Sequence, residues 1–235
     1  MARGVFPVGR WEKAVRYADL LATDGVVRGL IGPRETTRLW ERHLVNCAVV
    51  AEVLPEGSTV CDVGSGAGLP GVILAIARPD LTVTLVEPLL RRTTFLDEVV
   101  VALELDNVSV LRARAEALHG TARFDVVTSR AVAPLPRLAA WCLPLVSPTG
   151  AMIAMKGDRA AAEIEEAAAE LRTWGCSPPE IVEVGGSVMP SPGFVVRVAW
   201  ADPGSVMWPV TPPGRAQPSR PRSPHPRQRR RDRAK

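Results

Sequence analysis

Four glycines at positions 64, 66, 68 and 71 follow directly after an apolar run, and no other stretch constrains the fold as strongly. The run at 59–63 is rich in β-branched residues and predicts a strand, while the segment after the glycines has the character of a helix. Glycines at a strand-to-helix turn permit positive φ and let a ligand approach the backbone, with helix N–H groups directed at it. The turn therefore predicts a nucleotide-type binding site.

Strand-like and helix-like runs alternate from this turn onward, which predicts parallel strands with helices on both faces of a sheet. The last two strand-like runs are joined by a short link that only an antiparallel pair allows. We therefore expect an α/β, Rossmann-like fold with a seven-stranded, mostly parallel sheet and an antiparallel terminal hairpin. The expected strands are 59–63, 82–86, 108–111, 124–128, 151–155, 180–184 and 193–200, with a turn at 147–150. The expected helices are 9–30, 34–53, 70–78, 89–103, 115–118, 135–143 and 160–174.

Charge is distributed unevenly along the 235 residues. The whole chain carries +4 and the segment from Pro203 onward carries +8, so residues 1–202 carry −4. The C-terminal segment is rich in proline and arginine and cannot bury enough apolar surface to fold. We divide the chain into an N-terminal helical cap (1–57), a main domain (58–202) and a disordered basic tail (203–235). The tail is either a salt-sensitive arm for nucleic acid or a solubilising or dispensable extension.

The sequence contains no apolar run long enough to span a membrane, and its N-terminus lacks a signal-peptide core. We expect a soluble, cytoplasmic protein that has no membrane partner and is a monomer. Its four cysteines are Cys47, Cys61, Cys142 and Cys176, which lie far apart and form no Cys-x-x-Cys pair. They are interpreted as buried, reduced thiols, and no metal site is expected.

The spacing Gly66-x-Gly68-x-x-Gly71 formally satisfies the dinucleotide fingerprint, so another residue must identify the cofactor. Asp62 ends the first strand, where it is expected to face the charged group of a ligand. A carboxylate at ~4 Å from a pyrophosphate costs on the order of 4 kcal/mol at an effective dielectric constant of 20. S-adenosylmethionine has an ammonium and a sulfonium instead of phosphates. Asp62 therefore favours S-adenosylmethionine, and with it a class I methyltransferase.

Two further acids follow the next strands. Glu87 ends the second strand, where a carboxylate can accept hydrogen bonds from both hydroxyls of a ribose. The alternative is a solvated acid that opens the next helix. Glu116 follows the third strand within Arg114-Ala115-Glu116, where an adenine edge would be bound. The alternative is an ordinary acid at a helix N-terminus.

The fourth strand ends in Thr128-Ser129-Arg130-Ala131. Methylases of exocyclic amino groups usually have Asn/Asp-Pro-Pro-aromatic at this place, and pyrimidine C5 methylases need a cysteine after a proline; neither pattern is present. A guanine N7 needs no deprotonation, so positioning alone could suffice. Arg130 is the candidate catalytic residue, holding the methionine carboxylate or a base edge, unless it is a surface arginine. Lys156, after the fifth strand, is a candidate phosphate contact or else a solvated lysine.

Four motifs in order resemble the glucose-inhibited division protein B family, which methylates guanine N7 in 16S ribosomal RNA of the small subunit. They are Asp-Val-Gly-Ser-Gly-Ala-Gly-Leu-Pro-Gly from residue 62, Arg-His-Leu-Val-Asn-Cys from 42, Ser-Arg-Ala from 129 and Met-Lys-Gly from 155. The similarity covers about residues 10–200. The family often has Asp at Asn46, Phe at Leu69 and an acid-Ser pair at Glu87-Pro88, and none of these departures removes a group that methyl transfer requires. The basic tail has no counterpart in the family pattern.

The resemblance implies 16S ribosomal RNA or the 30S subunit as the partner and S-adenosylmethionine as the cofactor. By resemblance, the cofactor-binding positions are Gly64, Leu69, Ala115, Glu116 and Arg130; the residues argued above add Asp62, Gly66, Gly68 and Glu87. The Arg42-His43 pair would lie at the RNA-facing edge, and Arg91, Arg92 and Lys156 are the other expected RNA contacts. A small-molecule methyltransferase and a non-catalytic RNA-binding module with a vestigial cofactor pocket remain the alternatives.

Overall fold

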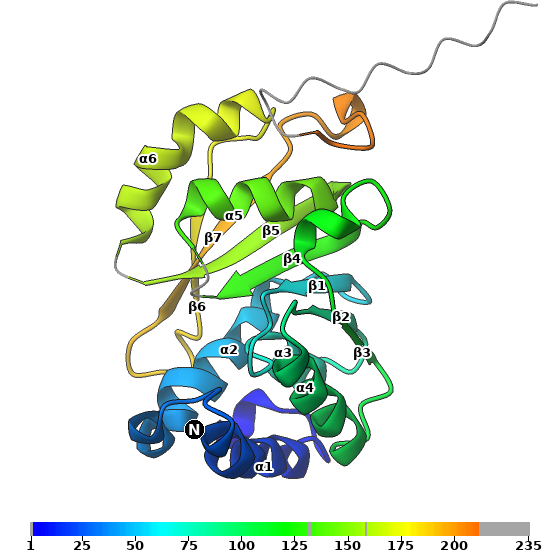
Figure 1. Ribbon diagram of the computed structural model, residues 1–235. Coiled ribbons are helices and arrows are strands. Elements are labelled where there is room, and N and C mark those ends of the chain that lie inside the picture. Colours follow the sequence, from blue (N-terminus) through cyan, green and yellow to red (C-terminus); the bar gives the residue numbers. More distant parts are fainter. Residues whose placement is uncertain (1, 131–132, 158, 212–235) are drawn as a thin grey trace, which may run out of the picture.

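The computed structural model describes residues 2–130, 133–157 and 159–211, and a single seven-stranded sheet lies at its centre (Figure 1). The strand order is β3-β2-β1-β4-β5-β7-β6. Neighbouring strands from β3 to β5 pair in parallel, whereas β7 is antiparallel to both β5 and β6. This arrangement confirms the predicted sheet and its terminal hairpin. The strands are β1 Thr59–Val63, β2 Thr82–Val86, β3 Val108–Leu111, β4 Phe124–Arg130, β5 Val146–Lys156, β6 Glu180–Val184 and β7 Gly193–Ala199.

Helices occupy the connections and the N-terminal region. The α-helices are α1 Trp11–Leu20, α2 Asn46–Ala48, α3 Gly71–Ala77, α4 Leu90–Ala102, α5 Leu135–Cys142 and α6 Ala160–Thr173. Turns of 3₁₀ helix are η1 Ala2–Val5, η3 Pro33–Arg38, η5 Val49–Val53, η6 Ala115–Leu118, η7 Leu143–Leu145 and η8 Pro203–Ser205; η2 Leu21–Gly25 and η4 Leu39–Val45 are π-helical. Among the described residues, no helix combines the length and apolarity needed to cross a bilayer.

The sheet separates two apolar clusters, because successive residues of a strand point to opposite faces. In β5, Ile153 belongs to one cluster and Met152 to the other. The N-terminal helices, α3 and α4 cover the first face, while α5 and α6 cover the second (Figure 1). Since both faces are covered, the carboxyl edge of the parallel strands is where a ligand site is expected.

Two segments differ from the sequence-based expectation. Residues 147–150, expected as a turn before the fifth strand, lie inside β5 as an irregularity in its pairing with β4. Residues 203–211, expected to be disordered, have a defined path in which Val206 and Val210 pack against the second cluster and Arg123 lies 5.6 Å over the Trp208 ring. The rest of the expected tail, 212–235, lies outside the described residues.

The four cysteines are free thiols and all are buried, which confirms their interpretation. Burial raises the pKa of Cys47 to about 11 and that of Cys142 to about 12. Thiolates, which are the reactive form, are therefore disfavoured at these positions.

Candidate cofactor and active site

The turn between β1 and α3 is built on glycines with positive φ, of 74° at Gly64, 59° at Gly66 and 99° at Gly68. Gly64 N–H donates to the Val86 carbonyl at 2.8 Å, which ties the turn to β2. A Cβ on Gly66 would meet nothing closer than the Gly64 carbonyl oxygen, at 3.8 Å. The backbone at Gly66 therefore leaves open space beside it, as the approach of a ligand requires.

The later glycines of the turn serve packing. A Cβ on Gly68 would lie 2.5 Å from the Val72 side chain and 2.8 Å from the Tyr17 hydroxyl. That hydroxyl donates to the Ala67 carbonyl at 2.7 Å, so α1 is fastened directly to the turn. A Cβ on Gly71 would lie 2.3 Å from the Leu85 side chain. Gly68 was predicted to bind the cofactor, but it lies against Tyr17 of α1 and Val72 of α3 and does not line the cavity described next.

A cavity of about 620 Å³ opens beside the turn, at the carboxyl ends of β1, β2 and β4. It brings together seven predicted site residues, namely His43, Gly64, Gly66, Leu69, Glu87, Arg92 and Arg130. Leu30, Ile31, Ser65, Ala67, Pro88 and Leu89 complete the lining and were not predicted. Ser65 and Ala67 lie between the glycines and so had a local signal, whereas Leu30 and Ile31 had none.

A smaller cavity of about 120 Å³ adjoins the first one, because Gly64 and Pro88 line both. Its wall includes the predicted residues Ala115 and Glu116 together with the side chain of Trp141. The lining is mainly apolar, which suits a flat aromatic ring.

Glu87 directly follows β2, and its carboxylate is fixed against the glycine turn that follows β1. Its side chain is 1% exposed, yet it lines the large cavity. Oε2 accepts hydrogen bonds from Gly66 N–H at 3.1 Å and from Arg92 Nη1 at 3.2 Å, and Oε1 accepts one from Leu89 N–H at 3.0 Å. These donors fix the carboxylate beside the glycine turn, at the carboxyl end of β2, as predicted.

Asp62 does not face the cavity, contrary to the expectation from its place at the end of β1. It is fully buried, and its Oδ2 accepts a hydrogen bond from Gly71 N–H at 2.9 Å. Its Oδ1 is buried without a hydrogen-bond partner among the described residues. Burial raises the pKa of Asp62 to about 7. Asp62 therefore supports the turn from the side away from the cavity. The expected repulsion between its carboxylate and a bound pyrophosphate does not apply, because the side chain does not reach the cavity.

Arg130, at the end of β4, is held by residues of the N-terminal helices. Its Nη1 donates to Cys47 Sγ at 3.1 Å, and its Nη2 donates to the Arg42 carbonyl at 3.3 Å and to His43 Nδ1 at 2.7 Å. His43 Nε2 lies 2.8 Å from Glu35 Oε2. A guanidinium has five N–H donors, so three described partners leave donors for a ligand.

Three of the expected RNA contacts do not line the cavity. Arg91 and Arg42 are exposed, and Arg42 lies 3.5 Å from Glu35. Lys156 has a side chain only 7% exposed and forms a 2.8 Å ion pair with Glu163, with a second hydrogen bond to the Ala133 carbonyl. Its position is therefore that of a buried structural lysine, not of a free phosphate contact.

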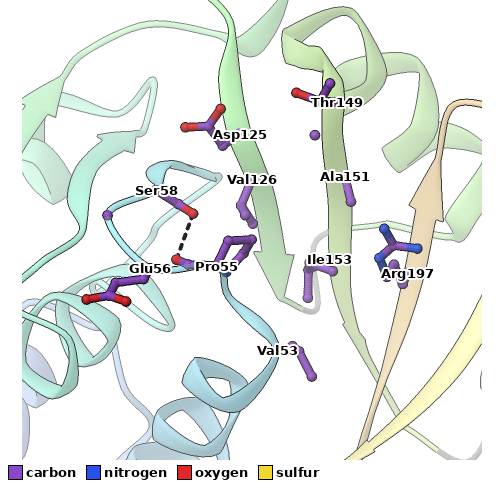
Figure 2. A pocket seen from close by; sticks show the side chains of 12 residues that line it. Val53, Pro55, Glu56, Ser58, Asp125, Val126, Thr149, Ala151, Ile153 and Arg197 are labelled. Carbon is purple, nitrogen blue, oxygen red and sulfur yellow. Dashed lines mark hydrogen bonds between the residues drawn. The ribbon is translucent and has the colours of Figure 1, made fainter. Parts of the chain in front are cut away.

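Another cavity, of about 290 Å³, lies at the opposite edge of the sheet, near the amino ends of β1 and β4 (Figure 2). Glu56, Asp125 and Arg197 contribute its charged groups. The Asp125 carboxylate accepts hydrogen bonds from the backbone N–H and the hydroxyl of Thr59, at 2.9 and 2.7 Å. This cavity contains no predicted site residue, and its carboxylate serves to join β1 to β4.

Comparisons with known proteins place these features in a family. The model of rRNA small subunit methyltransferase G matches residues 10–188. A protein called ribosomal RNA small subunit methyltransferase G from a Nocardioides species is 64% identical over 213 residues, covering 91% of this chain and 85% of the relative. The protein of the same name from Thermobifida fusca is 60% identical, covering 79% and 78%.

Solved structures support the fold at much lower identity. A ribosomal protein L11 methylase from Lactobacillus delbrueckii subsp. bulgaricus has a TM-score of 0.51 and 17% identity, covering 66% of this chain and 77% of its own. A precorrin-6y C5,15-methyltransferase from Geobacter metallireducens has a TM-score of 0.50 and 15% identity, covering 73% and 91%. These likenesses concern the methyltransferase fold alone. The family match, which includes the glycine turn, Glu87 and Arg130, assigns the chain: it belongs to the rRNA small subunit methyltransferase G family.

Proposed function

We propose that this protein transfers a methyl group from S-adenosylmethionine to N7 of a guanine in 16S ribosomal RNA. The observation that carries the proposal is the family match over residues 10–188, which includes every residue that lines the two adjoining cavities. The relatives are named for methylation of small-subunit ribosomal RNA. The choice of N7 comes from the family resemblance and from the residues at the end of β4.

The residues present fit S-adenosylmethionine. The open space beside Gly66 admits a ligand against bare backbone, and the fixed carboxylate of Glu87 can accept hydrogen bonds from the ribose hydroxyls. The apolar cavity at Ala115 and Glu116 suits the adenine ring. Arg130 lines the large cavity and can hold the methionine carboxylate through its unused donors.

Catalysis by these residues requires mainly orientation. S-adenosylmethionine supplies an electrophilic methyl group when bound. Attack on that methyl group would use the free lone pair of guanine N7, with the cofactor's sulfide as leaving group, so no proton would have to be removed from N7. The protein therefore needs no general base at this step. Its contribution is to align the two reactants and to exclude water, which is consistent with a site lined by Leu69, Leu30 and Ile31.

RNA binding must depend on a local patch or on the basic tail, because residues 1–202 carry a net charge of −4. Arg42, Arg91 and Arg92 lie on elements that border the cavity, and we assign the phosphate contacts to them. Arg42 and Arg92 also have carboxylate partners, but their side chains are 60% and 38% exposed. The expected contact from Lys156 is not retained, since its side chain is only 7% exposed and its charge is paired with Glu163. We expect the substrate to be a structured ribosomal particle and not free RNA. A few arginines at the rim of the cavity bind best to phosphates that the particle holds in a fixed arrangement.

The deciding experiment uses 30S subunits from a strain that lacks this gene. Incubation with the protein and S-adenosylmethionine should give one 7-methylguanine in 16S ribosomal RNA, located by base mapping with and without the protein. Cofactor binding without any product on 30S subunits would favour a small-molecule methyltransferase. No heat of binding at millimolar S-adenosylmethionine would favour a non-catalytic RNA-binding module.

The basic segment 212–235 is tested separately, by truncation after Thr211. If the segment neutralises phosphates, truncation should reduce the slope of log affinity against log salt by about 0.7–0.9 for each lost phosphate contact. The folded residues, including 203–211, remain in the truncated protein. An unaltered slope would show that the segment does not contact RNA.

A further inference from the structure

The imidazole of His43 lies between the carboxylate of Glu35 and the guanidinium of Arg130, at the wall of the large cavity. Its Nδ1 lies 2.7 Å from Nη2 of Arg130, and its Nε2 lies 2.8 Å from Oε2 of Glu35. A guanidinium has donors only, so Nδ1 must accept this hydrogen bond. The proton of a neutral imidazole is then on Nε2, which donates to the carboxylate. The two neighbours together fix the neutral ring and its tautomer.

This contact determines where the guanidinium of Arg130 lies. Arg130 comes from β4, whereas His43 and Arg42 come from η4 and Cys47 from α2. Of the three described partners of the guanidinium, the imidazole is the closest; the Arg42 carbonyl is at 3.3 Å and Cys47 Sγ, a weak acceptor, is at 3.1 Å. A protonated ring has no acceptor and places a second cation at 2.7 Å from the first.

We infer that His43 is a positioning residue whose neutral form holds Arg130 in the cavity, and that protonation of His43 releases the guanidinium and weakens cofactor binding. This inference rests on the proposed function, because it needs Arg130 to contact the cofactor. It changes the expected role of His43 from an RNA contact to a pH-sensitive support of the cofactor site.

The charges around the ring set the direction of the pH response. The groups that face it are the Glu35 carboxylate from η3, the Arg42 guanidinium from η4 itself and the Arg130 guanidinium from β4. Burial lowers the pKa of His43, Arg130 and Arg42 lower it further, and the hydrogen bond with Glu35 opposes them. The ring is therefore neutral at physiological pH, and binding should weaken only as the pH falls below the usual range for histidine.

Three variants separate this role from simple packing. His43→Asn retains an acceptor close to the position of Nδ1 but cannot titrate, whereas His43→Leu removes the acceptor. Calorimetry with S-adenosylmethionine and no RNA, between about pH 5 and about pH 8, should show wild-type affinity falling up to about tenfold per pH unit on the acid side. The Asn variant should lose this acid-side fall, and the Leu variant should bind weakly throughout. Glu35→Gln should move the fall to lower pH, because it removes the anion that favours the charged ring.

The buried carboxyl of Asp62 also titrates near this range, so it needs its own control. If the acid-side fall persists in His43→Asn and disappears in Asp62→Asn, the inference is wrong. The ring nitrogens supply a second readout that needs no cofactor: ¹⁵N chemical shifts, assigned by comparison with His43→Asn, should show a protonated Nε2 and a bare Nδ1 at neutral pH. The opposite tautomer would overturn the inference even if binding behaves as expected. Absence of binding by the wild-type protein at every pH would instead refute the proposed function.

Discussion

The two glycines at 66 and 68 can be tested as a matched pair, because both have positive φ but only one borders the cavity. Alanine in a left-handed conformation costs about 1–2 kcal/mol, and this applies to Gly66→Ala and Gly68→Ala alike. At Gly66 the new Cβ meets only a carbonyl oxygen at 3.8 Å, so little is added. At Gly68 it lies 2.5 Å from Val72 Cγ2 and 2.8 Å from the Tyr17 hydroxyl. Overpacking of this kind adds about 1–3 kcal/mol.

Gly68→Ala should therefore lower the free energy of unfolding by about 2–5 kcal/mol, and Gly66→Ala by about 1–2 kcal/mol. Urea denaturation followed by circular dichroism measures both values. Calorimetry with S-adenosylmethionine should show the reverse ranking, with Gly66→Ala at least about tenfold weaker, a loss of about 1.4 kcal/mol, because its methyl group occupies the ligand's approach. The reasoning is refuted if the two variants are equally destabilised, or if Gly66→Ala binds as the wild type does.

Three other changes test the remaining site residues. Glu87→Gln should weaken S-adenosylmethionine binding by about 10–100-fold in calorimetry, since hydrogen bonds to a charged group contribute about 1.5–3 kcal/mol; unchanged affinity would exclude the ribose role. Lys156→Met should lower the free energy of unfolding by about 3 kcal/mol, because Glu163 keeps a poorly solvated charge without its cation; full stability with weaker RNA binding would restore the phosphate role. The pKa of Asp62 rises from 3.8 in the unfolded chain to about 7 in the folded protein, so the folded protein binds this proton more tightly. The resulting stabilisation is fully present below about pH 4 and is lost as the pH rises through about 7. Denaturation from about pH 4 to about pH 8 should thus show a steeper loss of stability in the wild type than in Asp62→Asn, and parallel curves would contradict the raised pKa.

Local sequence patterns predicted the sheet well, because β-branched runs bounded by glycine and proline specify both a strand and its ends. The position of the large cavity at the carboxyl ends of β1 and β2 followed from the same rule, and Glu87 lies where the end of its strand implied. The same reasoning failed for Asp62, because a place at a strand end does not tell which face of the pleat a side chain occupies. Asp62 points to the start of α3 and bonds Gly71.

The contacts around Arg130 were beyond sequence reasoning. His43 and Arg130 are 87 residues apart, and no periodicity or composition records that their side chains meet. Lys156 is the last residue of β5, at the edge where a ligand contact was expected. Its partner Glu163 is on α6, and no sequence pattern distinguished that glutamate. Pairings of this kind depend on the packing of whole elements and emerge only from the fold.

The hydrogen bond from Tyr17 to Ala67 has a consequence for how such proteins can be recombined. It joins the first helix to the middle of the glycine turn, and the helices before residue 57 belong to the same apolar cluster as α3 and α4. A chimaera cut at the expected boundary between residues 57 and 58 would therefore replace part of the wall of the large cavity, at Leu30, Ile31 and His43, as well as the cap. Exchange of N-terminal segments between relatives should succeed only when the donor segment carries a tyrosine that reaches the turn and the recipient domain has a glycine at position 68 beside it.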